Sequence, residues 1–274
     1  MEIVLTTAVL PLFCGLVSAV ILVTTRTRPY LGYACVCLMC MLIYWQLQGL
    51  PKLIPINASQ KLFDALLIAA PVFWIFRRCS ARTSATIGFV MGMALLAWLL
   101  WRRLHLDASI FAFWEIGVPI VIASLVKSIG RDDIAANDQI ISLGVFALGL
   151  SIVALLAPFV GFAQVAMAFG LFSLAIGGFA FGYAILSGRA PFPDGISDGI
   201  QYLTFAIVGT ACVVGGFAPD IDRFAYALLP LALAAPPLCG GLLQRPASIH
   251  SILVGLVAAL PVALAVLLAI RNGN

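Results

Sequence analysis

The sequence predicts an all-α integral membrane protein, a multi-pass bundle of about ten transmembrane helices. Of its 274 residues, 63% are hydrophobic and only 9% are charged, whereas a soluble domain typically carries about 25% charged residues. The apolar residues also form runs long enough to cross a bilayer, which takes about 20 residues per helix. We therefore expect a single membrane domain over residues 1–274, in a plasma membrane or a bacterial inner membrane.

The boundaries of the expected spans follow from the length of each apolar run and from the charged residues that interrupt it. Ten segments result, and they cover approximately residues 3–24, 30–50, 61–77, 84–101, 108–127, 139–158, 160–187, 198–217, 223–243 and 249–270. The connections between these segments are short. Any binding site therefore has to lie within the membrane or at one of its faces.

The basic residues are distributed unequally between the two sides of this arrangement. Nine follow odd-numbered spans: Arg26, Arg28, Arg77, Arg78, Arg82, Lys127, Arg131, Arg189 and Arg245. Six fall on the opposite side: Lys52, Lys61, Arg102, Arg103, Arg223 and Arg271. The positive-inside rule then predicts that both termini lie on the non-cytoplasmic side. Because these cations are sparse and lie in short loops, they do not form a basic surface for nucleic acid.

A polar pattern near the middle of the first half recurs about 140 residues later, close to half the chain. The Tyr-x-x-Leu-x-Gly of residues 44–49 recurs at 183–188, and the Pro-x-x-x-Ser of residues 55–59 recurs at 193–197. Five spans is an odd number, so a duplicated five-span unit would insert its second copy upside down. The pattern therefore predicts a 5+5 inverted repeat. Its halves would be residues 1–128 and 139–270.

Two charged residues open the third span, where Lys61 and Asp64 are three positions apart. Such neighbours can pair on one helix face, and the long lysine side chain can extend its ammonium group to the membrane interface. This arrangement fits an interfacial anchor, and it also fits a polar pocket that includes Gln46 and Gln48. Asp64 is therefore a candidate for ligand binding.

Glu115 lies near the middle of the fifth span. Eight residues separate it from Asp107 and twelve from Lys127, so it is about 12 Å and about 18 Å from the two ends of the helix. A carboxylate at this depth costs about 2.5–3.5 kcal/mol on insertion scales, which favours a position facing the bundle interior or a wet cavity. Pro119, close to Gly117, frees the carbonyl group of Glu115 for a cation or a proton. The alternative is a protonated Glu115 that stabilises helix packing.

Three spans of the second half carry further candidate residues. Gln164 is the polar residue expected inside the seventh span, whose small residues favour close helix packing. Gln201 and Tyr202 lie in the eighth span, which the repeat makes equivalent to the third. The ninth span has three prolines between residues 230 and 237, so it cannot form one straight helix. Broken helices persist at membrane depth only against protein or a water-filled cavity.

The sequence offers little support for enzyme chemistry. Its two histidines, His105 and His250, lie near expected span ends and outside any metal motif. The cysteines at 35, 37 and 40 do not share one helix face, which favours packing over a metal site. Asp194 and Asp198 could hold Mg²⁺ against a diphosphate, as in a membrane-embedded lipid-processing transferase, or could cap a helix. No metal site, catalytic residue or cofactor is assigned.

Three function classes remain, and a small-solute or ion transporter with a site near Glu115 is favoured. Inverted halves, broken helices and a midplane carboxylate together are typical of transporters. The alternatives are a non-catalytic membrane subunit of a larger complex, whose helices contact protein partners, and the lipid-processing transferase. The candidate binding residues are Glu115, Gly117, Pro119, Asp64, Gln201, Tyr202 and Gln164.

The expected topology can be tested with reporter fusions at Arg131 and at the C-terminus. Ten spans with both termini outside put these two positions on opposite sides of the membrane. We expect a phosphatase reporter to be active only at the C-terminus and a fluorescent cytoplasmic reporter only at Arg131. The same side for both positions would contradict the arrangement.

Overall fold

The computed structural model describes residues 4–25, 29–49, 57–76, 136–187, 197–218, 220–240 and 247–272, with Thr86, Val90, Met91, Ala94 and residues 97–99. These residues form helices and no strand, so the prediction of an all-α protein is confirmed over this part of the chain. The expected fifth span, with Glu115, Gly117 and Pro119, lies outside the described residues. Most of the expected fourth span does as well.

Seven of the described helices are long and apolar enough to cross a membrane. A five-residue π-helix, η1 (Leu5–Val9), continues into α2 (Leu10–Thr24) to form the first of them. The others are α3 (Pro29–Gln48), α4 (Ala58–Phe76), α7 (Ala136–Leu156), α8 (Val160–Ser187), α9 (Ser197–Phe217) and α12 (Ala247–Asn272). These helices identify an integral membrane protein. The predicted total of about ten spans stays a prediction.

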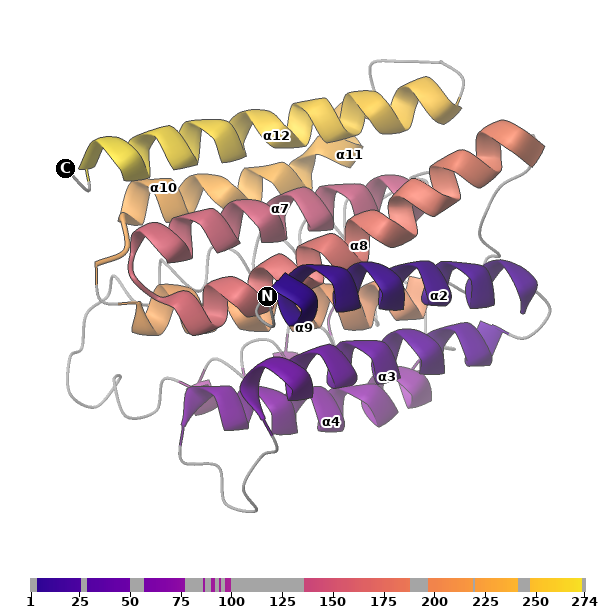
Figure 1. The fold of residues 1–274 in the computed structure, drawn as a ribbon, viewed down its shortest axis with the longest axis horizontal. Helices are drawn as coiled ribbons and strands as arrows, with labels where there is room; N and C mark the ends of the chain where they lie inside the picture. The colour runs from indigo at the N-terminus through magenta and orange to yellow at the C-terminus, as the bar shows by residue number, and fades with distance from the viewer. Residues whose placement is uncertain are drawn as a thin grey trace.

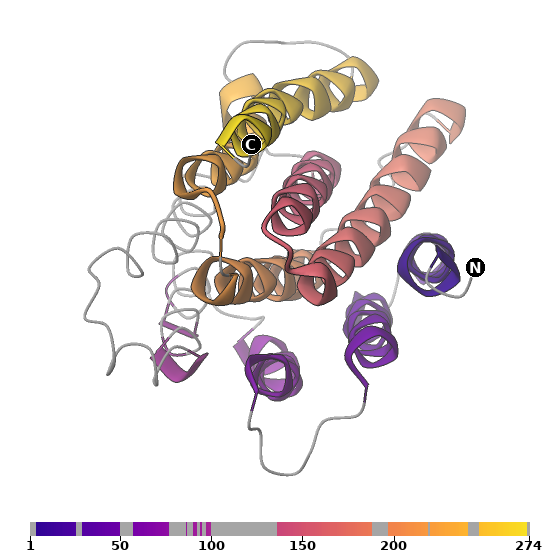
Figure 2. The same ribbon diagram turned by 60° about the vertical axis from the view of Figure 1, so that its left-hand side comes forward.

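The helices pack side by side around the hairpin of α7 and α8 (Figure 1). On one side of the hairpin lies α12, and on the other lie α2 and α3. Figure 2 shows α9 between this hairpin and the pair α3 and α4. Consecutive helices run in opposite directions, so α7 and α12 both begin at the end of the bundle where α8 stops. This common starting point positions the site described below.

Small residues allow α7 and α8 to approach closely. A Cβ atom on Gly144 would lie 3.2 Å from the carbonyl oxygen of Gly170, and one on Gly170 would lie 3.1 Å from that of Gly144. The two backbones therefore meet almost directly, as small residues permit in membrane helices. The close helix packing predicted for the seventh span is confirmed, and α8 also packs against α2, α3 and α9.

The ninth apolar segment is broken, as its prolines predict. It consists of α10 (Arg223–Leu228), a 3₁₀-helix η2 (Leu229–Ala234) and α11 (Ala235–Gly240). The carboxylate of Asp222 caps α10 by accepting a 2.8 Å hydrogen bond from the backbone N–H of Ala225. Proline lacks an N–H group, so it interrupts the regular α-helical hydrogen bonds of the segment. The broken segment packs against both α7 and α12.

The two halves of the chain have different helix neighbours. The pairs α2 and α7, α3 and α8, and α4 and α9 run in opposite directions, but simple up-and-down alternation gives the same result. Helix α2 packs along α8, whereas the equivalent pair, α3 and α7, has no comparable contact. An exact two-fold relation would require both. The inverted repeat therefore stays a prediction, and its support is the sequence pattern alone.

The close packing of α2 on α8 makes Gly15 sensitive to substitution. A Cβ atom there would lie 2.6 Å from Cβ of Ala175 and 2.7 Å from the backbone oxygen of Phe172. We expect Gly15→Ala to lower the free energy of unfolding by about 1–3 kcal/mol, because the helices must separate. The matched control is Gly178→Ala, since nothing lies within 4 Å of a Cβ at Gly178. Denaturant titration in mixed micelles measures both, and equal stabilities would contradict this packing.

Candidate functional site

A cluster of four polar side chains joins the first turns of α7 and α12. Asn137 and Asp138 come from α7, and His250 and Ser251 come from α12. We call these four residues the Asp138 network. A carboxylate in the first turn of a helix is stabilised by the helix dipole and by backbone N–H groups that lack helical partners. The local sequence therefore favours the N-terminus of α7 at this point. The packing of α7 against α12 brings the N-termini of the two helices together.

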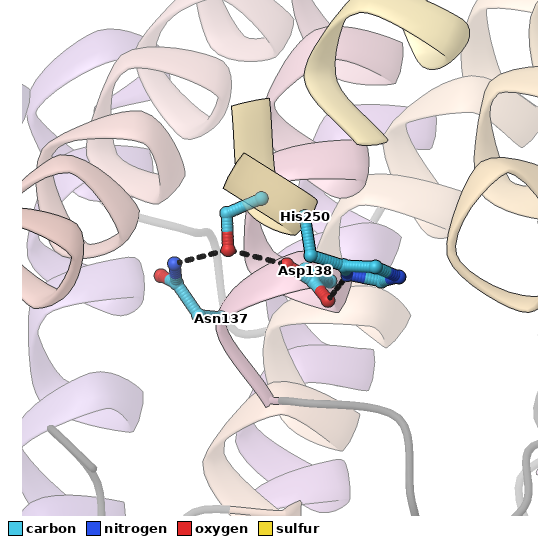
Figure 3. Close-up of polar contacts among 4 residues, drawn as sticks. Asn137, Asp138 and His250 are labelled. Atoms are coloured by element: carbon cyan, nitrogen blue, oxygen red, sulfur yellow. Dashed lines mark hydrogen bonds and ion pairs between the residues drawn. The ribbon is translucent and has the colours of Figure 1, made fainter. Parts of the chain in front are cut away.

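Both carboxylate oxygens of Asp138 have a partner on α12 (Figure 3). Oδ2 lies 2.8 Å from Nδ1 of His250, and Oδ1 accepts a 2.6 Å hydrogen bond from the Ser251 hydroxyl. Ser251 Oγ in turn accepts a 3.2 Å hydrogen bond from the side-chain amide of Asn137. Residues 112 positions apart in the sequence thus form one continuous chain of hydrogen bonds.

The network is buried. Asp138 is 1% exposed, Ser251 5% and Asn137 8%, whereas the side chain of His250 is 17% exposed. An ionised carboxylate at such a position is unfavourable unless it is paired and hydrogen-bonded. His250 can supply the compensating positive charge when its ring carries a proton on both nitrogens. The ring is thus the more accessible member of a buried pair.

One oxygen of the network has no partner among the described residues. Oδ1 of Asn137 is buried and accepts no hydrogen bond from that part of the chain, although Nδ2 of the same amide is bonded to Ser251. A Cβ atom on Gly177 of α8 would lie 3.6 Å from this oxygen, so the glycine leaves α8 without a side chain there. A buried acceptor without a donor costs about 1–3 kcal/mol. It is available to a hydroxyl, ammonium or water donor that reaches the network.

The geometry differs from that of a serine hydrolase. In a catalytic triad the serine hydroxyl is hydrogen-bonded to the histidine, which acts as its base. Here the hydroxyl of Ser251 and the ring of His250 both bond to Asp138, so the histidine does not activate the serine. Among the described residues, no three His, Cys, Asp or Glu side chains are grouped closely enough to hold a metal ion. The arrangement suits binding and release of a proton.

The sequence-predicted site residues in the described part of the chain lie on three helices: Asp64 on α4, Gln164 on α8, and Gln201 and Tyr202 on α9. Tyr202 is fully buried, and its hydroxyl donates a 3.2 Å hydrogen bond to the carbonyl oxygen of Leu66 on α4. Asp64 precedes Leu66 by two positions, so it lies on nearly the opposite side of α4. Gln201 is half-buried on α9. Gln164 is also only half-buried, and Ser173 is the fully buried polar residue of α8.

Lys61 bonds to a residue other than Asp64 in the structure. The ammonium group of Lys61 donates a 2.9 Å hydrogen bond to the backbone oxygen of Trp98 and lies 5.8 Å from the centre of its ring. A cation over the face of an indole ring is favourable, and it draws Lys61 away from the carboxylate. Within the described residues, Asp64 has no hydrogen bond or ion pair.

Sequence reasoning missed Asp138 and His250. A signal for them existed, because an Asn-Asp pair precedes the sixth span and a His-Ser pair opens the tenth, and alternation puts both on the same side of the membrane. That signal does not say that these two helices are neighbours. The contact between α7 and α12 supplies this information.

Comparison of the chain with protein-family models, with curated proteins and with solved structures found no match. The fold and the site therefore define the class directly. The chain is a multi-pass helical membrane protein in which a buried carboxylate on one helix contacts a partly buried imidazole on another.

The hydrogen bonds of the network predict a cost for removing Ser251. Ser251→Ala leaves Oδ1 of Asp138 and the amide N–H of Asn137 without their partner, so we expect a loss of about 1–3 kcal/mol in the free energy of unfolding. Ser173→Ala is the matched control, because this equally buried hydroxyl bonds only to the backbone of its own helix, at Phe169. Denaturant titration should separate the two variants. A neutral Ser251→Ala would contradict the network.

Proposed function

We propose that the chain is a membrane transporter of a small solute or an ion. The observation that carries this proposal is the buried pair of Asp138 and His250 in a bundle of apolar helices. Ionisable side chains inside membrane proteins are costly, and they mark ion paths and proton relays. A protein that needed only a stable bundle could fill the same space with apolar side chains, which often stabilise at least as well as a buried ion pair.

The broken ninth segment supports the same proposal. The pieces α10, η2 and α11 pack against α7 and α12, the two helices that carry the Asp138 network. Transporters commonly form their binding sites from interrupted helices, whose freed backbone groups bind substrate or ions. An ionisable pair beside an interrupted helix combines two features of such sites in one region.

Glu115, with Gly117 and Pro119, stays in the proposal as a second acidic position on the strength of its place in the sequence. A carboxylate near the middle of the fifth span could carry an ion across the part of the membrane that the Asp138 network does not reach. Asp64, Gln164, Gln201 and Tyr202 are secondary candidates for substrate contacts. The inverted repeat would set these groups around a common centre.

A non-catalytic membrane subunit is the second candidate. The outer face of α12 favours it, because a regular row of large apolar side chains is exposed along this helix: Ile252, Leu256, Leu260, Leu264, Leu267 and Ile270. Such a row can face lipid or another protein chain. In a subunit, the Asp138 network would be a cross-link between two helices. The lipid-processing transferase has weaker support, since Asp194 lies outside the described residues, as does the side chain of Asp198.

Transport can be tested on the purified chain in proteoliposomes adsorbed to a solid-supported membrane. Concentration jumps of protons, alkali cations and a panel of amino acids, sugars and organic anions should produce a current for at least one compound. We expect Asp138→Asn to reduce that current at least tenfold, because the nearly isosteric amide cannot carry the charge. Glu115→Gln tests the role of Glu115 in the same way. Ser173→Ala is the control for loss of active protein during purification and reconstitution.

The absence of any current across the panel, from protein that is folded by size-exclusion chromatography, would contradict the transporter. A current that both acidic variants leave unchanged would instead remove Asp138 and Glu115 from the transport mechanism. The membrane subunit would be favoured by a different result. In that case the chain purifies in mild detergent as a complex of fixed stoichiometry with another protein, and it gives no current without that protein.

A further inference from the structure

We infer that the Asp138–His250 pair binds one exchangeable proton, and that this proton is the coupling ion of the proposed transport. The second part rests on the proposed function, whereas the first part stands on the geometry of the network. The exchange occurs at Nε2 of His250, whose lone pair forms an N–H bond with a proton delivered by water and releases it to water again.

The position of the ring assigns the exchanging atom. Nδ1 faces Oδ2 of Asp138 at 2.8 Å, so in the neutral ring Nδ1 carries the hydrogen and donates it to the carboxylate. Nε2 is then the basic nitrogen. In Figure 3 it lies on the far side of the ring from Asp138 and Asn137, and none of the described residues bonds to it. His250 is also the most exposed member of the network.

The surrounding groups make a proton the natural counter-charge. With His250 neutral the pair has a charge of −1, and with the ring protonated the pair is neutral. Asn137 and Ser251 are uncharged, α8 presents Gly177, and Cys239 of α11 is the other titratable group facing Asp138 among the described residues. A thiol supplies no positive charge. Within the described residues His250 is the ion-pair partner of Asp138, so a proton on its ring supplies a full positive charge beside the carboxylate, in addition to the partial charge of the helix N-terminus.

The same geometry disfavours a metal cation. Hard cations such as Na⁺ and Ca²⁺ are bound by oxygen acceptors that point at the ion. Around Asp138 the neighbours are donors: the N–H of His250 and the O–H of Ser251 both point at the carboxylate. A cation would have to displace both donors before it could reach the oxygens. A proton on the outer nitrogen of the ring requires no such rearrangement.

The test is ¹⁵N nuclear magnetic resonance of histidine-labelled full-length protein in lipid nanodiscs, between pH 9 and pH 5. The chain has only two histidines, so a His105→Gln background leaves the signals of His250. We expect a single Nδ1–H tautomer at high pH and a ring protonated on both nitrogens at low pH. In Asp138→Asn the neutral ring should no longer be held in the Nδ1–H tautomer. Ser251→Ala, which leaves the ring contact intact, should retain it.

Coupling is tested by the transport currents of His250→Asn. The asparagine amide can still donate to Asp138 but cannot take up a proton, so this variant should fold. We expect its currents to lose their dependence on pH between 5 and 8. A purely structural role would leave the pH profile of the wild type in place.

The outcomes separate the two claims. A ring that stays in one protonation state from pH 9 to pH 5 would overturn the proton site, even if the chain transports a solute. A ring that titrates as expected, in a chain that gives no current for any compound, would support the proton site and overturn its role in coupling. Currents from His250→Asn with an unchanged pH profile would also overturn that role.

Discussion

The structure depends on one constraint, which is that a backbone inside a bilayer must satisfy its own hydrogen bonds because no water is present to do so. The described residues accordingly form helices. Many buried hydroxyl groups follow the same constraint: Ser173 donates to Phe169 at 2.7 Å, and Thr210 donates to Ala206 at 2.9 Å, each within its own helix. These hydroxyl groups are satisfied locally, whereas other polar side chains form hydrogen bonds between helices.

Two kinds of hydrogen bond between helices differ clearly in chemistry. Buried tyrosines donate to backbone carbonyl groups of neighbouring helices, as Tyr202 does to Leu66 and Tyr226 to Ala211. These bonds are neutral, and they hold helices in register. The Asp138 network is different because it places an ionisable pair in a buried position, where an apolar pair would often be at least as stable. We therefore attribute the first kind to folding and the second to function.

The region around the Asp138 network also combines rigid and interrupted backbone. The hairpin of α7 and α8 is closely packed at Gly144 and Gly170, which gives Asp138 a firm support. The broken segment of α10, η2 and α11 packs against both α7 and α12, the two helices that carry Asp138 and His250.

The sequence by itself determined the helical class and the positions of most helices, because hydropathy and proline are local properties that act through a single segment. The expected span at residues 160–187 coincides with α8 (Val160–Ser187), and the prolines predicted the break in the ninth segment. Using charge as a sign of a span end, however, put Asp138 in a loop. Only the tertiary structure decided that α7 and α12 are neighbours, because packing between segments 112 residues apart depends on the shapes of both surfaces.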